Sequence, residues 1–286
     1  MPSLRDIKRR IKSVESTKQI TKAMEMVAAA KLRRAQSRVE SARPYGLKMQ
    51  QMLESLAGAA ARLHHPLFEE RRVNTTLLVV ITADRGFCGS YNSNILKAAV
   101  RYLNETPKDS VKLGVVGKKG VDFFKKRPFP IAFKIPQTGG TADMQMVRNL
   151  ANDITKRFES GEFDEVRLLY TQFVSTTKYN LTLEKFLPIE KIEDIDEGMP
   201  SQYIFEPSAE VIFSSLVPRY CLTKILSAFL EAFASEYGSR MIAMSNATKN
   251  AKDMIESLTL VRNKARQAAI TKELLDIVGG AEAIKG

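Results

Sequence analysis

A proline-free stretch near the C-terminus, residues 219–278, constrains this chain more than any other feature, and its one glycine is Gly238. Small and apolar residues recur through it in steps of three or four, with a mean spacing of about 3.5 residues, the period of a left-handed coiled coil. A single helix of this length would extend for about 90 Å at 1.5 Å per residue. The stretch therefore predicts a long helix that buries one stripe against another helix. The stripe consists of Leu222, Leu226, Phe229, Phe233, Tyr237, Met241, Met244, Ala247, Ala251, Met254, Leu258, Val261, Ala265 and Ala268.

A matching stripe lies at the other end of the chain, where the same period recurs. Ser3 is the expected N-cap, with Asp6 favourably placed in the first turn. Pro44 predicts a kink or a short break. An antiparallel pair of terminal helices follows; the alternative is that both stripes are ordinary faces of a helical bundle. The N-terminal stripe consists of Ile7, Ile11, Val14, Thr17, Thr21, Met24, Ala28, Leu32, Ala35, Val39 and Ala42, continued by Met49, Met52, Leu53 and Leu56.

Between the two stripes, apolar β-branched runs alternate with helical patterns, which indicates an α/β domain. Strands are expected at 76–82, 111–116, 131–135, 165–174 and 178–187, and helices at 93–104, 119–126 and 141–159. The expected fold class is α/β, with a long antiparallel coiled coil of the N- and C-terminal helices and an inserted Rossmann-like α/β domain. The expected domains are a coiled-coil helix at 1–57, the globular domain at 75–190 and a second coiled-coil helix at 208–286, kinked at Pro218.

The net charge of +12 is concentrated in the predicted coiled coil. Residues 1–52 contain 13 Lys and Arg against 4 Asp and Glu, and residues 219–286 contain 10 against 7, whereas residues 53–218 contain 21 of each. A basic coiled coil predicts an acidic partner, either acidic protein loops, nucleic acid or an anionic membrane surface.

The sequence gives little support to a catalytic, cofactor or metal site. Glycines follow two predicted strands, at Arg85-Gly86 and Gly117-Lys118, but neither loop has the spacing of a dinucleotide or Walker motif. Cys88 lacks a histidine nearby in sequence, and Cys221 is expected to pack inside a helix. The histidines, His64 and His65, are adjacent and are expected to be exposed loop residues. No catalytic residue, cofactor or metal is therefore predicted.

Membrane and targeting signals are also weak. The longest apolar run, Leu77–Ile81, is far shorter than the ~18 residues that a spanning helix needs. The basic N-terminus superficially resembles a mitochondrial transit peptide, but Asp6, Glu15 and Glu25 argue against one.

Five segments of this chain resemble the γ subunit of bacterial F-type ATP synthase. In order, they are ITKAMEMVAAAKL at 20–32, DRGFCGSYN at 84–92, SRMIAM at 239–244, NAT at 246–248 and NKARQAAITKE at 263–273. The likeness extends over essentially the whole chain. Departures are few: Lys272 replaces an expected glutamine and Phe87 the more usual leucine.

The resemblance implies a central-stalk rotor subunit that carries torque from the membrane c-ring to the catalytic α/β ring, coupling proton flow to ATP synthesis on β. The implied partners are the α and β subunits, the ε subunit and the c-ring, with no nucleic acid. The implied location is peripheral, on the cytoplasmic side of the cell membrane through the c-ring.

The expected partner contacts come from charge and from the resemblance. The basic side chains of the first helix are expected to face acidic loops of β: Lys8, Arg9, Arg10, Arg33 and Arg34. By resemblance, Arg240, Gln267, Thr271 and Glu273 would form polar contacts with the catalytic ring, and Met24 would lie near a lever loop of β.

Two other functional classes stay open. A basic coiled-coil protein that binds nucleic acid would track phosphates, although the chain lacks a groove-reading module. A small α/β enzyme with a dimerising coil would turn over nucleotide without partners.

Overall fold

The computed structural model describes residues 3–59, 65–107, 110–190 and 209–285. Its contacts form two compact units, one of residues 1–28 with 241–286 and the other of residues 29–240. Within the described residues, no helix has the length and apolarity needed to cross a bilayer. The predicted domain limits at residues 57, 75, 190 and 208 stay a prediction.

The first helix, α1 (Leu4–Ala59), begins at the predicted cap. The Asp6 N–H donates to Ser3 Oγ at 3.2 Å, and Ser3 Oγ donates to the Asp6 carboxylate at 2.7 Å. The helix continues through Pro44, so of the predicted kink or short break the break is wrong, and the kink stays a prediction. Pro44 removes one backbone donor, but Arg43 beside it pairs with Glu231 and Gly46 lies close to Thr223 and Ser227. These contacts hold the helix together across the proline.

The last helix, α5 (Ala209–Lys285), is 77 residues long and is likewise continuous through Pro218 and through Gly279-Gly280. The expected linker at 194–207 lies outside the described residues. The predicted long C-terminal helix is therefore confirmed and is longer than the stripe that indicated it.

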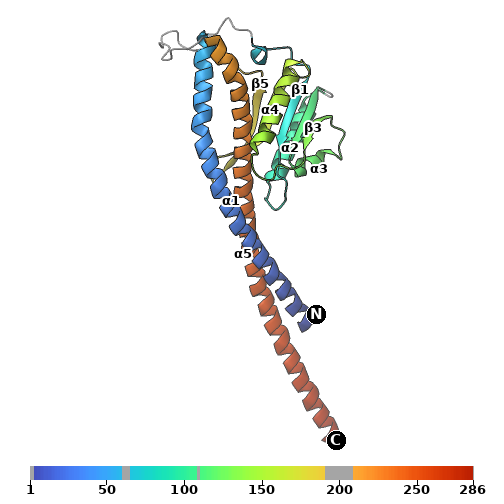
Figure 1. Ribbon diagram of the computed structural model, residues 1–286. Helices are drawn as coiled ribbons and strands as arrows, with labels where there is room; N and C mark the ends of the chain where they lie inside the picture. Colours follow the sequence, from blue (N-terminus) through green and yellow to red (C-terminus); the bar gives the residue numbers. More distant parts are fainter. Residues whose placement is uncertain (1–2, 60–64, 108–109, 191–208, 286) are drawn as a thin grey trace. The chain divides into compact units, whose positions relative to one another are not determined.

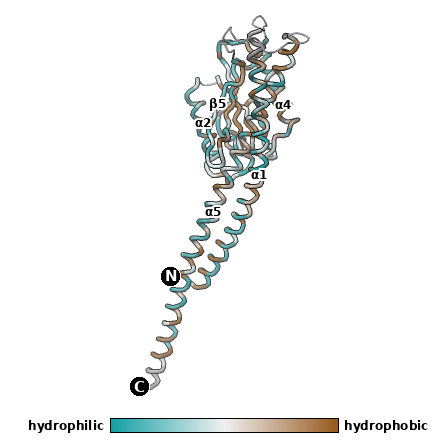
Figure 2. The backbone as a smooth tube through the Cα atoms, turned by 90° about the vertical axis from the view of Figure 1, so that its left-hand side faces the viewer, coloured by the Kyte–Doolittle hydropathy of each residue, from teal (hydrophilic) through white to brown (hydrophobic). Residues whose placement is uncertain are grey.

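Helices α1 and α5 pair antiparallel, as predicted. Within residues 29–240, three contacts link the helices: Gly46 lies near Ser227, Arg43 pairs with Glu231, and Leu32 lies near Gly238. The residue number decreases along α1 from one contact to the next while it increases along α5, so the two helices run in opposite directions. Within the other unit, Thr248 Oγ1 donates to Thr21 Oγ1 at 2.8 Å. Hydrophilic and hydrophobic residues alternate along both helices (Figure 2), as a shared stripe requires. Predicted stripe residues buried in α1 are Ile7, Ile11, Thr21, Ala28, Leu32, Ala35, Val39, Met49 and Leu53.

The inserted sheet has five strands in the order β3-β2-β1-β4-β5. Strands β1 (Thr76–Ile81), β2 (Val111–Val116), β3 (Ile131–Ile135) and β4 (Glu165–Phe173) are parallel, and β5 (Tyr179–Leu187) pairs antiparallel with β4. The helices are α2 (Tyr91–Glu105), α3 (Lys118–Phe124) and α4 (Met144–Glu159), and a 3-10 turn, η1, spans Pro66–Phe68. Each predicted strand and helix of this domain is present, with ends shifted by at most three residues.

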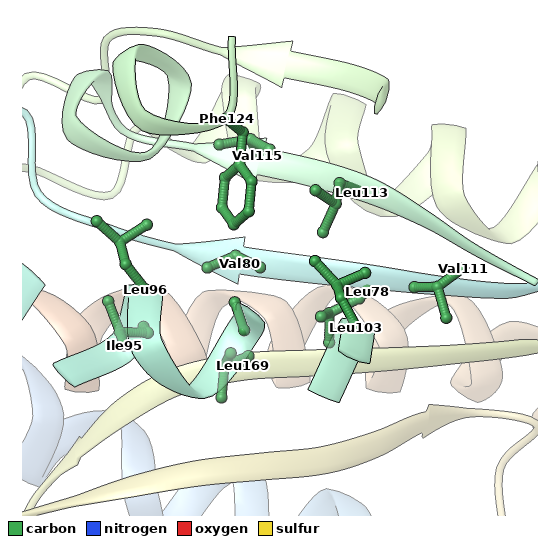
Figure 3. Packing of buried hydrophobic residues seen from close by; sticks show 11 residues of the cluster. Leu78, Val80, Ile95, Leu96, Leu103, Val111, Leu113, Val115, Phe124 and Leu169 are labelled. Carbon is green, nitrogen blue, oxygen red and sulfur yellow. The ribbon is translucent and has the colours of Figure 1, made fainter. Parts of the chain in front are cut away.

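One core of the sheet lies under α2 and α3 (Figure 3). Leu78 and Val80 of β1 meet Ile95 of α2 and Phe124 of α3, all fully buried. Continuous apolar runs such as β1 suit a parallel sheet covered on both faces. Gly114 lies between Leu113 and Val115 on β2 and so faces the opposite side of the sheet, where a Cβ would lie 2.3 Å from the Phe133 ring.

Helix α5 covers the other face of the sheet, and α1 lies beyond it (Figure 1). Leu169 of β4 packs in the core under α2, whereas the next residue, Tyr170, bonds Glu184, which accepts a hydrogen bond from Lys224 of α5. Consequently, residues 228–239 of α5 are buried on every side. This double coverage of α5 is not part of the sequence-based prediction.

Candidate functional site

The carboxyl ends of the parallel strands carry the glycine loops singled out in the sequence. Asp84, three residues beyond β1, accepts hydrogen bonds from the N–H groups of Lys118, Thr138 and Gly139 and from the Thr138 hydroxyl, at 2.9 to 3.3 Å. One carboxylate therefore joins the loops that follow β1, β2 and β3.

The loop after β2 turns at Gly117, which has φ 90°. A Cβ at Gly117 would lie 2.1 Å from the Thr82 carbonyl oxygen, so this turn requires glycine. The Thr82 hydroxyl donates to the Val116 carbonyl oxygen and accepts from the Gly120 N–H, which fastens the turn to β1.

In nucleotide-binding α/β proteins, backbone N–H groups at a strand-to-helix turn hold a phosphate. Here the N–H groups of Lys118, Thr138 and Gly139 donate instead to the chain's own Asp84 carboxylate. These N–H groups therefore join three loops of the sheet to one another.

Helix α5 also closes the crevice between β1 and β4, where the strand order reverses and sheets of this type bind ligands. Ser239 Oγ donates to the Cys88 carbonyl oxygen at 2.7 Å, and the Arg240 guanidinium lies 3.3 and 3.2 Å from the carbonyl oxygens of Arg85 and Gly86. From the first residue of α2, Tyr91 Oη donates to the Ala232 carbonyl oxygen at 3.2 Å. The loop after β1 is thus fixed to α5 by three hydrogen bonds, and the start of α2 by a fourth.

Phe87 lies at the tip of this loop with φ 62°, a backbone conformation that bulky residues rarely adopt. Its side chain is 73% exposed. Because the carbonyl oxygens on both sides of it are bound by α5, the strained loop is held rigidly and presents this aromatic ring to solvent.

The polar groups of α5 beneath the loop are deeply buried. Glu236 and Arg240 form an ion pair in which the two side chains are 6% and 12% exposed. Burial raises the pKa of Glu236, and the Arg240 charge opposes that shift. Tyr237 Oη donates to the Gly140 carbonyl oxygen at 2.6 Å, and burial, with the Glu236 charge, raises the pKa of Tyr237 to about 12.

The two cysteines are poor nucleophiles. Burial raises the pKa of the Cys88 thiol, whose sulfur accepts a hydrogen bond from Asn92 Nδ2 at 3.1 Å. Burial raises the pKa of Cys221 to about 12. Since the thiolate is the reactive form, neither position favours covalent catalysis.

His65 has a structural position that differs from the exposed loop residue expected. Its Nδ1 accepts from the Leu67 N–H at 3.2 Å as the cap of η1, and its ring stacks edge-on to Phe68 and Phe213. His64 lies outside the described residues. Within the part of the chain that the structure describes, no group of three His, Cys, Asp or Glu could hold a metal ion.

The predicted basic contacts of α1 point to solvent. Lys8, Arg9, Arg10, Arg33 and Arg34 are all exposed. Arg9 pairs with Asp6 at 3.0 Å in a largely exposed ion pair of the kind that contributes little to stability. These side chains are therefore available to a partner, and their roles stay predictions.

The remaining predicted contacts differ in environment. Met24 is half-buried on α1, whereas Gln267, Thr271 and Glu273 are exposed near the end of α5. Arg240 is instead an internal connector between α5 and the loop after β1.

Large apolar side chains with 50 to 71% of their surface exposed lie along the C-terminal third of α5. The predicted stripe residues Met254 and Val261, at 53% and 46%, are exposed there too, so the predicted burial of the stripe is wrong at these two positions. Such a surface is unusual on a chain that works alone and indicates a partner. The residues are Leu260, Ile270, Leu274, Leu275, Ile277 and Val278.

Sequence reasoning missed the polar contacts that α5 makes with the sheet. Glu231 accepts from the Phe173 N–H at 2.8 Å, and Ser235 Oγ donates to the Thr171 carbonyl oxygen at 3.0 Å. The sequence does contain a pattern that indicates this polar face of α5. Glu231, Ser235 and Ser239 recur every four residues, so they lie on one face of the helix.

Comparisons with known proteins agree with the resemblance found in the sequence. The family model described as ATP synthase matches residues 3–284. The ATP synthase gamma chain of Desulforamulus reducens is 47% identical over 285 residues, and that of Moorella thermoacetica is 46% identical over 286 residues; both matches cover all of each chain.

Solved structures give the same fold. A chain in the central stalk and c-ring structure of Tetrahymena thermophila mitochondrial ATP synthase is 28% identical, with a TM-score of 0.62 over 80% of this chain and 99% of that one. A chain in a structure of Euglena gracilis mitochondrial ATP synthase has a TM-score of 0.68 over 98% of this chain and 94% of that one. At 21% identity it supports the fold alone.

The family model and the full-length relatives together decide the assignment. The recognised segments at 20–32, 84–92 and 263–273 lie on α1, on the loop after β1 and on α5, the elements that define this architecture. The chain belongs to the ATP synthase gamma chain family.

Proposed function

We propose that this chain is the central-stalk rotor subunit of an F-type ATP synthase. The observation that carries the proposal is full-length identity of 47% to an ATP synthase gamma chain in a chain whose terminal helices pair antiparallel. The rotor transmits torque from the membrane c-ring to the catalytic α/β ring and so couples proton flow to ATP synthesis.

The two-helix arrangement suits a shaft. A single helix bends and twists easily, whereas a supercoiled pair shares torsional load along its seam. In this chain the seam combines small residues, such as Ala28 and Ala251, with ion-pair and hydroxyl contacts that fix its register.

The exposed apolar turns at the end of α5 fit a sleeve formed by α and β. Leu274, Leu275, Ile277 and Val278 are exposed rather than covered by another described segment, and Ala268 and Ala269 nearby offer little side-chain interlocking. An apolar bearing allows contact without directional bonds that would stop rotation.

The specific contacts that follow are with acidic and polar loops of the catalytic ring. Lys8, Arg9, Arg10, Arg33 and Arg34 provide exposed positive charge for acidic β loops. Gln267, Thr271 and Glu273 are exposed for polar contacts, and Met24 lies near a lever loop of β. For Arg240, an indirect role through the loop after β1 is more consistent with its 12% exposure.

Catalysis is assigned to the β subunit, and this chain is a non-catalytic subunit of the complex. Full-length identity to ATP synthase gamma chains supports the subunit assignment, and the raised pKa values of the Cys88 and Cys221 thiols disfavour covalent catalysis by this chain. The chain would be held at the cytoplasmic side of the cell membrane through the c-ring and the ε subunit. The family relationship gives no support to the nucleic-acid-binding alternative.

The test is co-expression of this chain with its α and β subunits, followed by purification and ATPase measurement. We expect one assembly that contains all three subunits and hydrolyses ATP, and no turnover by this chain alone. A variant with Lys8, Arg9, Arg10, Arg33 and Arg34 changed to glutamate should assemble weakly or hydrolyse ATP without coupling.

A matched control keeps the charge change but moves it. Changing Lys97, Arg101, Lys125, Lys126 and Arg127, all exposed on the α/β domain, to glutamate should leave binding to the catalytic ring intact. Failure of the unmodified chain to join α and β would overturn the proposal.

A further inference from the structure

A polar cleft of about 590 Å³ opens beside the carboxyl ends of β1, β2 and β3. Its charged lining comes from four segments that are distant in sequence: α1, the loop after β1, the start of α3 and α5. The charged residues are Lys31, Asp84, Arg85, Lys118, Glu236 and Arg240. The volume is within the range of small-molecule sites, but the lining is far more polar than that of a typical apolar pocket.

The two carboxylates of the cleft already have partners. Asp84 accepts four hydrogen bonds from Lys118, Thr138 and Gly139. Glu236 is paired with Arg240, whose guanidinium is also bound to carbonyl oxygens of the loop after β1. The donors to Asp84 are neutral, so its charge remains in the cleft; the four cations and two carboxylates of the lining give a formal net charge of +2.

The other three cations form no close ion pair with a described residue, although the Lys31 charge acts on Glu236 at longer range. Among the described residues, the side chains of Lys31, Arg85 and Lys118 form no ion pair, and all three are exposed at the cleft. Lys31 Nζ lies 5.4 Å from the centre of the Tyr237 ring, which orients it toward the cleft wall. Three unpaired cations from three segments thus surround one cavity.

We propose that this cleft binds a small phosphate-bearing anion through Lys31, Arg85 and Lys118. Two ammonium groups and one guanidinium match the several oxygens of a polyphosphate, which accept charge-assisted hydrogen bonds. The ligand is inorganic polyphosphate or the phosphate chain of a nucleotide, which share this chemistry. It is held by side chains, because Asp84 occupies the backbone N–H groups.

Binding would connect the loop after β1 with α1 and α3. Arg85 belongs to the loop that presents Phe87. Helix α5 already donates hydrogen bonds to this loop, and a ligand bound to Arg85 would contact the loop on its solvent side as well. The loop and Lys118 become less mobile when the anion is bound, and the chain is stabilised in proportion to occupancy.

The experiment is calorimetric titration of the full-length chain with inorganic phosphate, tripolyphosphate and ATP at two salt concentrations. We expect saturable binding of one tripolyphosphate or ATP per chain, with weaker binding of phosphate. Arg85→Gln and Lys118→Gln should each weaken binding about tenfold, as expected for loss of one charge-assisted contact. Equal affinity for tripolyphosphate and ATP assigns the site to the phosphates alone, and tighter ATP binding adds a contribution from the nucleoside.

Matched controls separate a site from general attraction to a basic chain. Lys97→Gln and Arg101→Gln remove the same charges from exposed positions on α2, away from the cleft. Binding that is absent, or that falls equally in the cleft and control variants, would overturn the proposal. The measurement needs no other subunit, so its failure leaves the rotor assignment untouched.

Discussion

Two segments of the same helix, α5, show how one sequence pattern can serve two environments. Residues 228–239 are buried on every side, between α1 and the sheet, within the unit of residues 29–240. Residues 266–280 are almost entirely exposed, although they carry Leu274, Leu275, Ile277 and Val278. The surface of the first segment is covered by other parts of the same chain, whereas the surface of the second is exposed and available to a partner.

The difference between these segments lies in their polar residues. The buried segment satisfies each polar side chain internally, as Glu231 does with Arg43 and the Phe173 N–H. Among the described side chains, no buried polar atom lacks a hydrogen-bond partner. The exposed segment has few contacts with other segments of the chain. The Thr271 hydroxyl, for example, donates only to the Gln267 carbonyl oxygen of its own helix. The part of α5 whose polar side chains are hydrogen-bonded within the chain is therefore the part that specifies the fold.

The largest contrast should come from removing one apolar side chain in each segment. Phe229→Ala should lower the free energy of unfolding by about 3–5 kcal/mol because Phe229 is fully buried. Leu275→Ala should change it by less than about 0.5 kcal/mol because the side chain is 66% exposed. Urea unfolding of the isolated chain measures both. Similar losses from the two variants would mean that the end of α5 is also part of the chain's own core.

A second contrast compares a partly buried ion pair, in which Arg43 is 45% and Glu231 10% exposed, with a largely exposed one. Glu231→Gln removes the charge that pairs with Arg43 at 3.0 Å, and the free energy of unfolding should fall by about 1.5–3 kcal/mol. Glu256→Gln, which breaks the exposed pair with Lys252 at 3.8 Å, should cost less than about 0.5 kcal/mol. The same unfolding experiment decides. If Glu231→Gln were as mild as Glu256→Gln, the link between α1, α5 and β4 would not depend on this charge.

A third prediction uses pH and the buried Cys221 of α5. Its pKa is about 12 in the folded chain and 9.0 when unperturbed, so between these values the unfolded chain releases a proton that the folded chain keeps. The free energy of unfolding should therefore fall as pH rises through this window, by up to about 1.4 kcal/mol per pH unit from this group. Cys221→Ala should show a shallower fall, and at neutral pH the slopes of the two proteins should agree. Parallel alkaline slopes would show that Cys221 ionises equally in both states.

The smallest effect is expected at two threonines. Thr248→Val removes a hydroxyl that contacts Thr21 across the helix pair at 2.8 Å, and should cost about 0.5–1.5 kcal/mol. Thr271→Val removes a hydroxyl bonded only within its own helix, and should be nearly neutral in the isolated chain. Thermal unfolding of the two variants compares them. A larger loss at Thr271 would reverse the assignment of seam and free surface.

Much of this fold follows from periodicity. The 3.5-residue stripes predicted both long helices and their antiparallel pairing, and apolar runs such as β1 predicted each strand. The short break predicted at Pro44 does not occur. The rule that proline breaks a helix describes isolated helices and omits the tertiary contacts of Arg43 and Gly46 that hold α1 together across the proline. The stripe alone also could not separate burial in a seam from burial on every side, because helical period describes one face at a time.

The site was predictable only in part. Exposed basic residues of α1 followed from charge, whereas the role of Arg240 did not, because its contacts with the carbonyl oxygens of Arg85 and Gly86 are revealed only by the fold. The function of Asp84 as an internal anion was likewise hidden, since its donors follow different strands.

The central claim, that this chain turns inside the catalytic ring, is tested most directly by watching it turn. An assembly of α, β and this chain would be fixed to a surface through the ring, with a bead attached through Lys97→Cys on exposed α2. The rotor assignment predicts that the bead rotates in one direction while ATP is hydrolysed and stops when ATP is removed. Hydrolysis at the full rate with a stationary bead would contradict it.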